Sequence, residues 1–509
     1  QVALFSPRVQ HHLAWPLQFT AMLGTQGVVI LACAVDAADK GLLPATFKAL
    51  SLQLDIGAKA LGLLTFAQSV TFSVALPVWG SLLRFHCARD LLVFGCLLWA
   101  AATFCIALSS TFWTHFALRL VNGAALAAVS PLAQALLCDI VPEAHRGRAF
   151  GLVSASAGVM SMLSGFVTTG IATSMVAGIR GWRLMHIVVA LASVGVAALV
   201  HRTVPAVKPP ALEAHAPSWF SEQREVVKKI LTKPSFVILV LQGVTGGIPW
   251  NGFAFLTLYF QLSGYTDWQA SMIGLAGGIG GACGGYLGGV MGDFFSHYYP
   301  SAGRIAVAQV SVVSGIVCFL WFMSVPFGPG SFVHVSIAVC CFHLTGSWTP
   351  AAACRPICGS IFRDSRDRAQ VLALWIALEG LVAAICGAPL AGVLSETFGF
   401  RLEGGHGAQE GSQNASVDAL RKALLGVALI PWSLCALAWF LMYWAYPRDR
   451  CQEESGGKEV LCDGEEGKPL QKGEAPGLVA YGTTRLASGK VNQFDDVNLR
   501  AKLIGKPLE

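Results

Sequence analysis

The chain has 509 residues, of which 54% are hydrophobic and only 13% are charged, and its formal net charge is +6. Soluble proteins carry roughly 25% charged residues, so this composition excludes a soluble globular protein. The modest charge is spread through loops, which excludes nucleic acid as the natural partner. Most of the 15 cysteines lie inside apolar runs, so they predict packing residues, with no disulfide framework, no metal site and no cofactor.

A membrane-spanning helix needs about 20 consecutive, mostly apolar residues. The sequence contains twelve such runs, six before and six after a polar break. They lie at about 17–42, 60–83, 91–110, 114–138, 149–172 and 183–200, and then at about 236–261, 269–292, 304–325, 331–354, 369–394 and 422–446. The predicted fold is therefore an all-α membrane protein with twelve transmembrane helices in two six-helix bundles, over residues 1–200 and 236–446.

The polar break at 201–235 is predicted to be a linker. Within it, the apolar residues of the charged stretch 218–233 lie roughly on one helical face. That pattern is typical of a helix on the membrane surface, and a solvated linker helix would show it equally well. The tail at 447–509 is charged, Gly-rich and mostly non-periodic, so we expect it to be disordered.

Lys and Arg concentrate in the cytosolic loops of membrane proteins. Placing the N-terminus in the cytosol puts the basic linker and the tail there too. The same orientation collects most loop arginines on the inside, namely Arg84, Arg89, Arg146, Arg148, Arg304, Arg355, Arg363, Arg366 and Arg368. Seven basic residues become outer exceptions, namely Lys48, Lys59, Arg180, Arg183, Arg401, Arg421 and Lys422. We therefore predict a cytosolic N-terminus, linker and tail.

Two signatures occur once in each half. Gly80 ends the second run before a basic turn, and residues 289–293, from Gly289 to Asp293, end the eighth run in the same way. Residues 146–149 after the fourth run match residues 366–369 after the tenth. Internal duplication of six-helix units is the plan of many secondary transporters.

Charged residues inside a span need a functional or pairing reason, because burying them is costly. Asp36 and Lys40 are four residues apart in the first run, so they share a helix face and can neutralise each other. Asp39 is three residues from Asp36 and also adjacent, so two carboxylates and one ammonium leave one uncompensated acid, which suits a proton-binding group; the alternative is a cluster merely solvated at the outer interface. Arg119 in the fourth run lies at about the depth of Asp39, and pairing with Asp39 or Asp36 is sterically reasonable. Glu379 in the eleventh run is the isolated membrane acid of the second half.

The chain resembles the major facilitator superfamily, and within it the Spinster-like group, most closely its plant and protist members. The resemblance covers about residues 20–445. It is carried by residues 36–44 (DAADKGLLP), 98–104 (LWAAATF), 119–123 (RLVNG) and 139–147 (DIVPEAHRG). The resemblance implies two rocking bundles and a membrane carrier, and animal relatives of the group move lysophospholipids and sphingosine-type lipids.

The resemblance also suggests roles for individual residues. Asp39 matches the acid of the family's Asp-Arg pair, and Lys40 stands in the place of its arginine. Arg119 matches a different arginine that is tied to proton coupling, although it could instead brace its helix. Arg84 stands where the family's inner loop carries an acid, which puts that latch in doubt, whereas Asp293 keeps the role in the second half. The predicted gating set is Gly80, Arg84, Asp139, Arg146, Gly289, Asp293 and Arg366, and the predicted proton-coupling set is Asp36, Asp39, Arg119 and Glu379.

Polar and aromatic residues inside the spans predict the wall of a substrate cavity, with bonding between helices as the alternative for each. The candidates are Lys40, Gln134, Gln242, Trp250, Asn251 and His343. Gly247 and Pro249 predict a break in the seventh helix. The glycines at 277, 281, 285 and 289 predict close packing of the eighth helix.

We therefore predict a secondary active transporter that works by alternating access and is coupled to protons. A lipid-like amphiphile of lysophospholipid or sphingoid type is expected from the resemblance. The rivals are a carrier of a small polar organic solute and a non-transporting membrane sensor with the same fold. No nucleotide-binding or Ser/His/Asp pattern predicts an enzyme. The expected partners are the substrate, protons and membrane lipids; the oligomeric state and the choice between plasma and endolysosomal membrane stay open.

Overall fold

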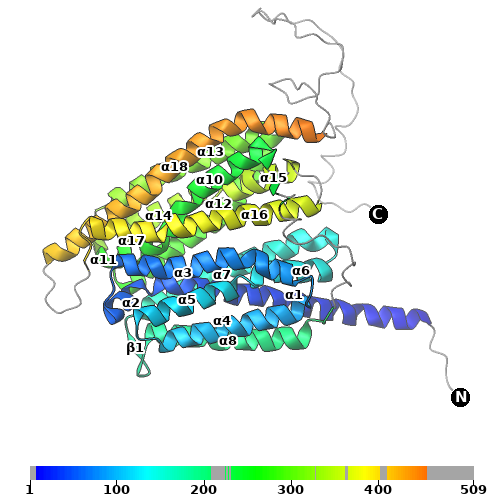
Figure 1. Cartoon of the computed structure of the whole chain (residues 1–509), viewed down its shortest axis with the longest axis horizontal. Coiled ribbons are helices and arrows are strands. Elements are labelled where there is room, and N and C mark those ends of the chain that lie inside the picture. The colour runs from blue at the N-terminus through cyan, green and yellow to red at the C-terminus, as the bar shows by residue number, and fades with distance from the viewer. Residues whose placement is uncertain are drawn as a thin grey trace, which may run out of the picture. The chain divides into compact units, whose positions relative to one another are not determined.

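The computed structural model describes residues 7–207, 224, 227–228, 231–326, 328–361, 365–401 and 410–454. Most of the linker helix expected at 218–233 and the tail beyond Glu454 lie outside these residues. The described first half contains α1 (Pro7–Ala45), α2 (Phe47–Leu54), α3 (Ala58–Leu82), α4 (Ala88–Leu108), α5 (Phe112–Leu126), α6 (Val129–Ile140), α7 (Glu143–Ile171), β1 (Met175–Val176), β2 (Ile179–Arg180) and α8 (Gly181–Thr203) (Figure 1).

Every regular element in the described residues of the second half is a helix. Its elements are α10 (Pro234–Gly252), η1 (Phe253–Phe255), α11 (Leu256–Leu262), α12 (Asp267–Tyr298), α13 (Gly303–Ser324), η2 (Pro329–Ser331), α14 (Phe332–Gly346), η3 (Pro350–Cys354), α15 (Arg355–Ile361), α16 (Ser365–Cys386), α17 (Ala388–Thr397) and α18 (Glu410–Glu454). Each predicted apolar run corresponds to one of these helices or to consecutive helices that continue one another.

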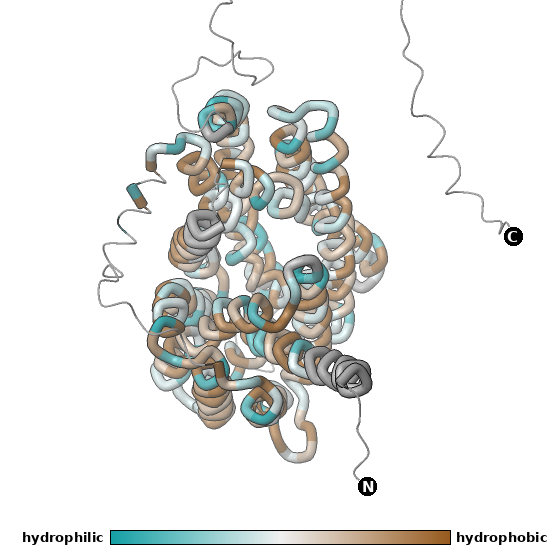
Figure 2. Tube along the Cα trace, turned by 90° about the vertical axis from the view of Figure 1, so that its right-hand side faces the viewer, coloured by the Kyte–Doolittle hydropathy of each residue, from teal (hydrophilic) through white to brown (hydrophobic). Residues whose placement is uncertain are grey.

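Eleven spans in the described part of the chain are long and apolar enough to cross a membrane. Helix α1 is not among them, but its 39 residues exceed the length that a span needs, and adding it would make the predicted twelve. Large apolar side chains such as Trp113, Leu437 and Phe440 are exposed. Hydrophobic residues continue around the outsides of the helices (Figure 2). Helices that are apolar on all sides are typical of a membrane protein, so the all-α membrane fold is confirmed.

Two predicted boundaries differ from the structure. The seventh span breaks after Gly252, where η1 separates α10 from α11, whereas Pro249 lies inside α10. The expected break at Gly247 and Pro249 was therefore wrong by several residues. Helix α18 continues to Glu454, so residues 447–454 are helical and the expected disordered tail cannot begin at 447.

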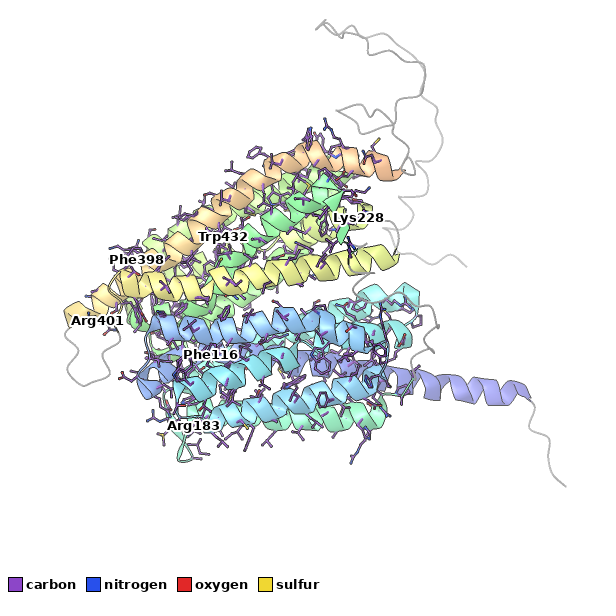
Figure 3. The ribbon with its side chains drawn as sticks, viewed as in Figure 1. Phe116, Arg183, Lys228, Phe398, Arg401 and Trp432 are labelled. Atoms are coloured by element: carbon purple, nitrogen blue, oxygen red, sulfur yellow. The ribbon has the colours of Figure 1, made fainter. Side chains whose placement is uncertain are left out.

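The two ends of the helices carry different short elements. We call the end with α2, the β1–β2 turn and α11 the outer end, and the end with α6 and α15 the inner end (Figure 1). Arg183 and Arg401 lie at the outer end and Lys228 at the inner end (Figure 3). In the β1–β2 turn, the positive φ angles of Ala177 and Gly178 allow the two-residue turn of a hairpin.

Buried apolar side chains of the described residues form three cores. One core belongs to the first half and includes Trp99 and Leu126, and one belongs to the second half and includes Ile357 and Trp439. The third core is shared by both halves and includes Phe47 of α2 and Tyr259 of α11, which lie at the outer end. Burial of apolar surface therefore joins the two halves at the outer end and leaves each half with a separate core toward the inner end.

Glycines line the face of α12 that packs against α14 and η3. The buried ones are Gly277, Gly280, Gly284, Gly288 and Gly292. A Cβ atom at Gly284 would collide with the backbone carbonyl of Leu344, whereas one at Gly285 would meet nothing. The predicted close packing is present, but the face differs from the predicted one, because a repeat of four drifts away from a helix of 3.6 residues per turn.

We expect Gly284→Ala to destabilise the protein by about 1–3 kcal/mol, because the added methyl group overpacks the α12–α14 contact. Gly285→Ala is the matched control, and its better helix propensity should leave stability unchanged or slightly higher. Thermal unfolding of both purified variants measures the difference. Equal unfolding temperatures would contradict this packing assignment.

Candidate functional site

Asp39 is the centre of a buried polar network in the first half. Its side chain is fully buried; Oδ2 accepts a hydrogen bond from Thr103 Oγ1 (2.5 Å) and Oδ1 accepts one from Asn122 Nδ2 (3.2 Å). Asn122 Nδ2 also donates to Thr103 Oγ1 (2.9 Å), and Asn122 Oδ1 accepts from Gln68 Nε2 (3.0 Å). Four helices, α1, α3, α4 and α5, thus hold one acid through neutral partners. Such hydrogen bonds are what makes a buried carboxyl group tolerable.

Gly123 explains how α3 and α5 come close enough for this network. It follows Asn122 on α5, and a Cβ atom there would collide with the backbone carbonyl of Gln68 on α3. The two helices can therefore approach until the side chains of Gln68 and Asn122 meet. Glycine permits such contact between helix backbones inside a membrane.

Arg119 is also fully buried, but its hydrogen-bond partners are two histidines. Its Nε donates to His115 Nε2 (3.4 Å) on α5, and its Nη2 lies 3.0 Å from His186 Nε2 on α8. No ion pair joins Arg119 to Asp39 in this part of the structure, and Nη1 has no hydrogen-bond partner. The expected Arg119–Asp39 pair is therefore not formed in this conformation, and Arg119 also does not bond backbone carbonyls.

The hydrogen bonds assign the proton positions on both imidazoles. His186 Nδ1 lies 2.7 Å from the carbonyl oxygen of Trp182, which can only accept, so this nitrogen carries the proton. Ser109 donates its hydroxyl to Ile106 O and must accept from His115 Nδ1 (3.0 Å). Each ring then offers a lone pair on Nε2 to Arg119, which can only donate. Two neutral imidazoles therefore hold the buried guanidinium.

Asp36 and Lys40 form the expected ion pair on one face of α1. Lys40 Nζ lies 2.7 Å from Asp36 Oδ2 and 4.4 Å from the ring centroid of Phe72. The Asp36 side chain is nearly buried, and its Oδ1 has no hydrogen-bond partner. Asp39 is thus the acid of this cluster that lies outside the ion pair.

Glu379 lies on α16 against two glycines of α10. Its carboxylate would be in contact with Cβ atoms placed on Gly243 and Gly247, and the Nε1 of Trp375 also lies against Gly243. No described residue forms a hydrogen bond or ion pair with Glu379, and Trp375 Nε1 has no partner either. The structural alternative for Glu379, an accepted hydrogen bond from a neighbouring helix, is therefore absent among the described residues.

The two halves are bonded to each other at the outer end. Asp267, at the start of α12, accepts from Lys48 Nζ (2.8 Å) on α2 and from Thr173 Oγ1 (2.6 Å), both in the first half. Glu396 Oε1 on α17 accepts from the backbone N–H of Lys59 on α3 (2.8 Å). Phe47 and Phe255 pack edge to face beside these bonds, with ring centroids 4.9 Å apart. We call Lys48, Thr173, Asp267, Lys59 and Glu396 the outer closure.

The sequence model of the Major Facilitator Superfamily matches residues 29–354. The chain belongs to this superfamily. Its fold is similar to a bacterial homologue of the human lysosomal transporter Spinster in an inward-facing, unoccupied conformation, with a TM-score of 0.73 and 15% identity over 84% of this chain and 98% of that one. The superfamily fold is also seen in the nucleoside transporter NupG (TM-score 0.61, 16% identity, 83% and 99% covered).

A D-xylose-proton symporter is similar as well, with a TM-score of 0.64, 13% identity and coverage of 84% of this chain and 98% of that chain. Identities this low show the superfamily fold alone. No curated protein sequence matches the chain.

The predicted cavity residues of this superfamily member lie in different surroundings. Gln134 is exposed, and Gln242 is buried and donates to Leu239 O. Asn251 Nδ2 lies 3.4 Å from Ser69 Oγ across the two halves, while its Oδ1 accepts from Ala388 N. Trp250 is 38% exposed. It stacks on Phe342 and contacts His343, Phe253 and Trp432, so the second half presents an aromatic cluster.

The predicted gating residues lie in different surroundings. Asp293 pairs with Arg304 (2.7 Å), whose Nη1 donates to Ala352 O and so ties α12, α13 and η3 together at the inner end. Arg146 donates to the carbonyls of Cys138 and Val141, which end α6. Asp139 is exposed, and Arg84 lies in the turn after α3. Gly80 has open space around its α-carbon, and a Cβ atom on Gly289 would only just touch Ala351. The side chain of Arg366 lies outside the described residues.

Sequence reasoning missed His115, His186, Thr103 and the outer closure. Thr103 and Asn122 lie inside the stretches that carry the family resemblance, so they could have been found there. His115 and Arg119 are four residues apart, which places them on one helix face. No local pattern indicates His186 or Asp267, because their partners are distant in sequence. No metal-binding group of three or more His, Cys, Asp or Glu occurs in the described chain.

We expect Asp267→Asn to weaken the outer closure, because it removes the anion that binds Lys48 and Thr173. A charged hydrogen bond is worth about 1.5–3 kcal/mol, so the population in which the outer end is open should rise by roughly ten- to a hundredfold. Spin labels on the outer ends of α2 and α12 report this population as a longer distance between the halves.

Asp418→Asn is the control for Asp267→Asn. Asp418 pairs with Lys422 within α18, near the same end, so removing that pair breaks no bond between the halves. Identical distance distributions for parent and Asp267→Asn would show that Asp267 does not close the outer end.

Proposed function

We propose that this protein is a proton-coupled secondary active transporter of the Spinster-like group that works by alternating access. The observation that carries the proposal is the unequal joining of the two halves. Among the described residues, a shared apolar core and the outer closure join the halves at one end, and separate cores lie toward the other. A transporter needs such a closure to form and break on alternate sides of its substrate.

Asp39 and Arg119 supply the coupling step of this proposal. Both are fully buried, and each has neutral partners in this conformation. When Asp39 is protonated, it no longer attracts the guanidinium, and Arg119 rests on the histidines. When Asp39 loses its proton, a buried ionised carboxylate needs a cation, and Arg119 is the cation at its depth. Proton binding at Asp39 then changes the relative free energies of the two conformations of the alternating-access cycle.

Asp36 and Glu379 complete the proposed set of proton-coupling residues. Asp36 shares α1 with Asp39 and is neutralised by Lys40, so it tunes the charge beside the main site. Glu379 has no charged partner among the described residues and lies between α10 and α16, where it can take up a proton or a cationic group of the substrate. Asp293 with Arg304, and Arg146 at the end of α6, are the proposed braces of the inner gate.

We propose a lipid-like amphiphile as the substrate. The similarity to the bacterial Spinster homologue and the aromatic cluster around Trp250 support this class, because aromatic rings offer a large apolar contact surface. A small polar organic solute is the second candidate, favoured by the similarity to the nucleoside and xylose transporters. Plasma and endolysosomal membranes both remain compatible with the proposal.

Asp39→Asn should abolish the response of uptake to a pH gradient and leave counterflow exchange measurable. The amide keeps the size of the side chain and its acceptor for Asn122, but it cannot take up a proton. The measurement is uptake into proteoliposomes with a fluorescent lysophospholipid, sphingosine, xylose or a nucleoside as probe, first screened on the parent protein.

Asp90→Asn is the matched control, because Asp90 is an exposed acid that pairs with Arg89 at the inner end. It should accumulate the probe as the parent does. Gradient-driven accumulation by Asp39→Asn at the parent level would exclude Asp39 as the coupling site. A parent that moves none of the four probes, with or without a gradient, would favour the non-transporting sensor.

A further inference from the structure

We infer that His115 and His186 form a second proton-binding site, for which the proton and Arg119 compete. This inference rests on the proposed function, because it supplies the other resting place of the arginine in the coupling step. Both rings are fully buried, and both present an unprotonated Nε2 to the same guanidinium. We call the two rings the imidazole cradle.

Competition follows from the donor and acceptor properties of the groups. A proton that binds Nε2 of either ring converts that nitrogen from an acceptor to a donor, so its hydrogen bond with Arg119 must break. The ring then carries a positive charge beside a guanidinium, and at a separation of a few ångströms in a buried site this repulsion is large. The cradle can therefore hold Arg119 or a proton, but not both.

Asp39 is the place to which a displaced Arg119 can move. The charged group that faces both rings of the cradle is Arg119 on α5, and Arg119 in turn interacts with Asp39 on α1. Arg183 on α8 donates to Ser109 O, the backbone oxygen of the serine whose hydroxyl contacts His115. The neighbouring helices α3 and α4 contribute the neutral side chains of Gln68 and Thr103 at this network. Arg119 Nη1 is already without a partner, so the guanidinium can donate toward a carboxylate without losing a bond at that atom.

The exchange conserves charge and protons. In the conformation described here, Arg119 lies in the cradle and the proton belongs on Asp39 Oδ2, whose O–H then donates to Thr103 Oγ1; the opposite direction of this bond, from Thr103 to Oδ2, belongs to the ionised acid. In the alternative, the proton lies on Nε2 of a cradle histidine, Arg119 donates to the ionised Asp39, and the bonds from Thr103 and Asn122 rearrange. One proton and one guanidinium thus exchange places, and no further ion is needed. His115 is one helical turn nearer to the outer end than Arg119.

The test measures protons directly and uses no substrate. Purified protein with ¹⁵N-labelled histidine rings is placed in lipid nanodiscs, and the ring signals of His115 and His186 are assigned with the His115→Gln and His186→Gln variants. In the parent at neutral pH, both rings should show the neutral form with the proton on Nδ1. Arg119→Met removes the guanidinium that competes with the proton. At a given acidic pH, the ratio of protonated to neutral imidazole should then rise at least about tenfold for His115 or His186.

Asp39→Asn provides the opposite arm of the test, because it removes the anion that can attract Arg119. The guanidinium should then stay in the cradle, and both rings should remain neutral at every pH at which the parent begins to protonate them. His343 is the internal control, since it is a partly buried histidine of the second half that lies against Gly277 and Trp250. Its signal should be the same in all variants.

Two results would overturn the inference: neutral rings at neutral pH that carry their proton on Nε2 instead of Nδ1 in the parent, or ring protonation that is unchanged by both Arg119→Met and Asp39→Asn. If Arg119→Met does not fold, the Asp39→Asn arm decides alone, and parent-like protonation there would also overturn it. None of these outcomes bears on transport, which the uptake assay tests separately.

Discussion

A buried arginine needs hydrogen-bond acceptors, and this requirement organises the first half of the protein. A guanidinium without acceptors in a membrane interior would cost several kcal/mol. Arg119 therefore draws His115 and His186 together from two helices and fixes the tautomer of both rings. Asp39 is satisfied independently by Thr103 and Asn122. Because neither charged group depends on the other in this conformation, each is free to change partners when a proton arrives.

The outer closure connects this chemistry to the movement of the two halves. Helix α1 carries Asp39 and packs against α7 and α8, while α2, which follows it, carries Lys48 and Phe47. A shift of α1 that accompanies a change at Asp39 is therefore transmitted within a few residues to the Lys48–Asp267 bond between the halves. Packed interfaces have discrete arrangements, so a small displacement can select between closed and open ends.

Features that depend on length and apolarity were predictable from the sequence. The spans were found because about 20 apolar residues are a requirement of the bilayer, and the Asp36–Lys40 pair because a spacing of four places both on one helix face. The position of the break after Gly252 and the glycine face of α12 were predicted wrongly. A proline or glycine favours a helix break or close helix packing, but it does not determine at which residue the break or the contact occurs. The actual faces were decided by contacts with Cys340, Leu344 and Trp348 on a neighbouring segment.

The candidate site was only half predictable for a similar reason. Asp39, Arg119 and Glu379 were found because a charge inside a span demands an explanation. The partners that Arg119 actually uses were not found, because a neutral histidine or threonine in a span is unremarkable until the fold places it beside a charge. The same holds for Asp267, whose partner Lys48 is 219 residues away.

Infrared difference spectroscopy of Asp39 tests whether Arg119 and a proton exchange partners. With Arg119 in the imidazole cradle, we expect the C=O stretch of a protonated carboxyl group to be present in the parent and absent in Asp39→Asn. The band should disappear from the parent as pH rises and Arg119 moves to the ionised acid. A spectrum in which Asp39 is ionised while ¹⁵N signals place Arg119 on both histidines would contradict the account.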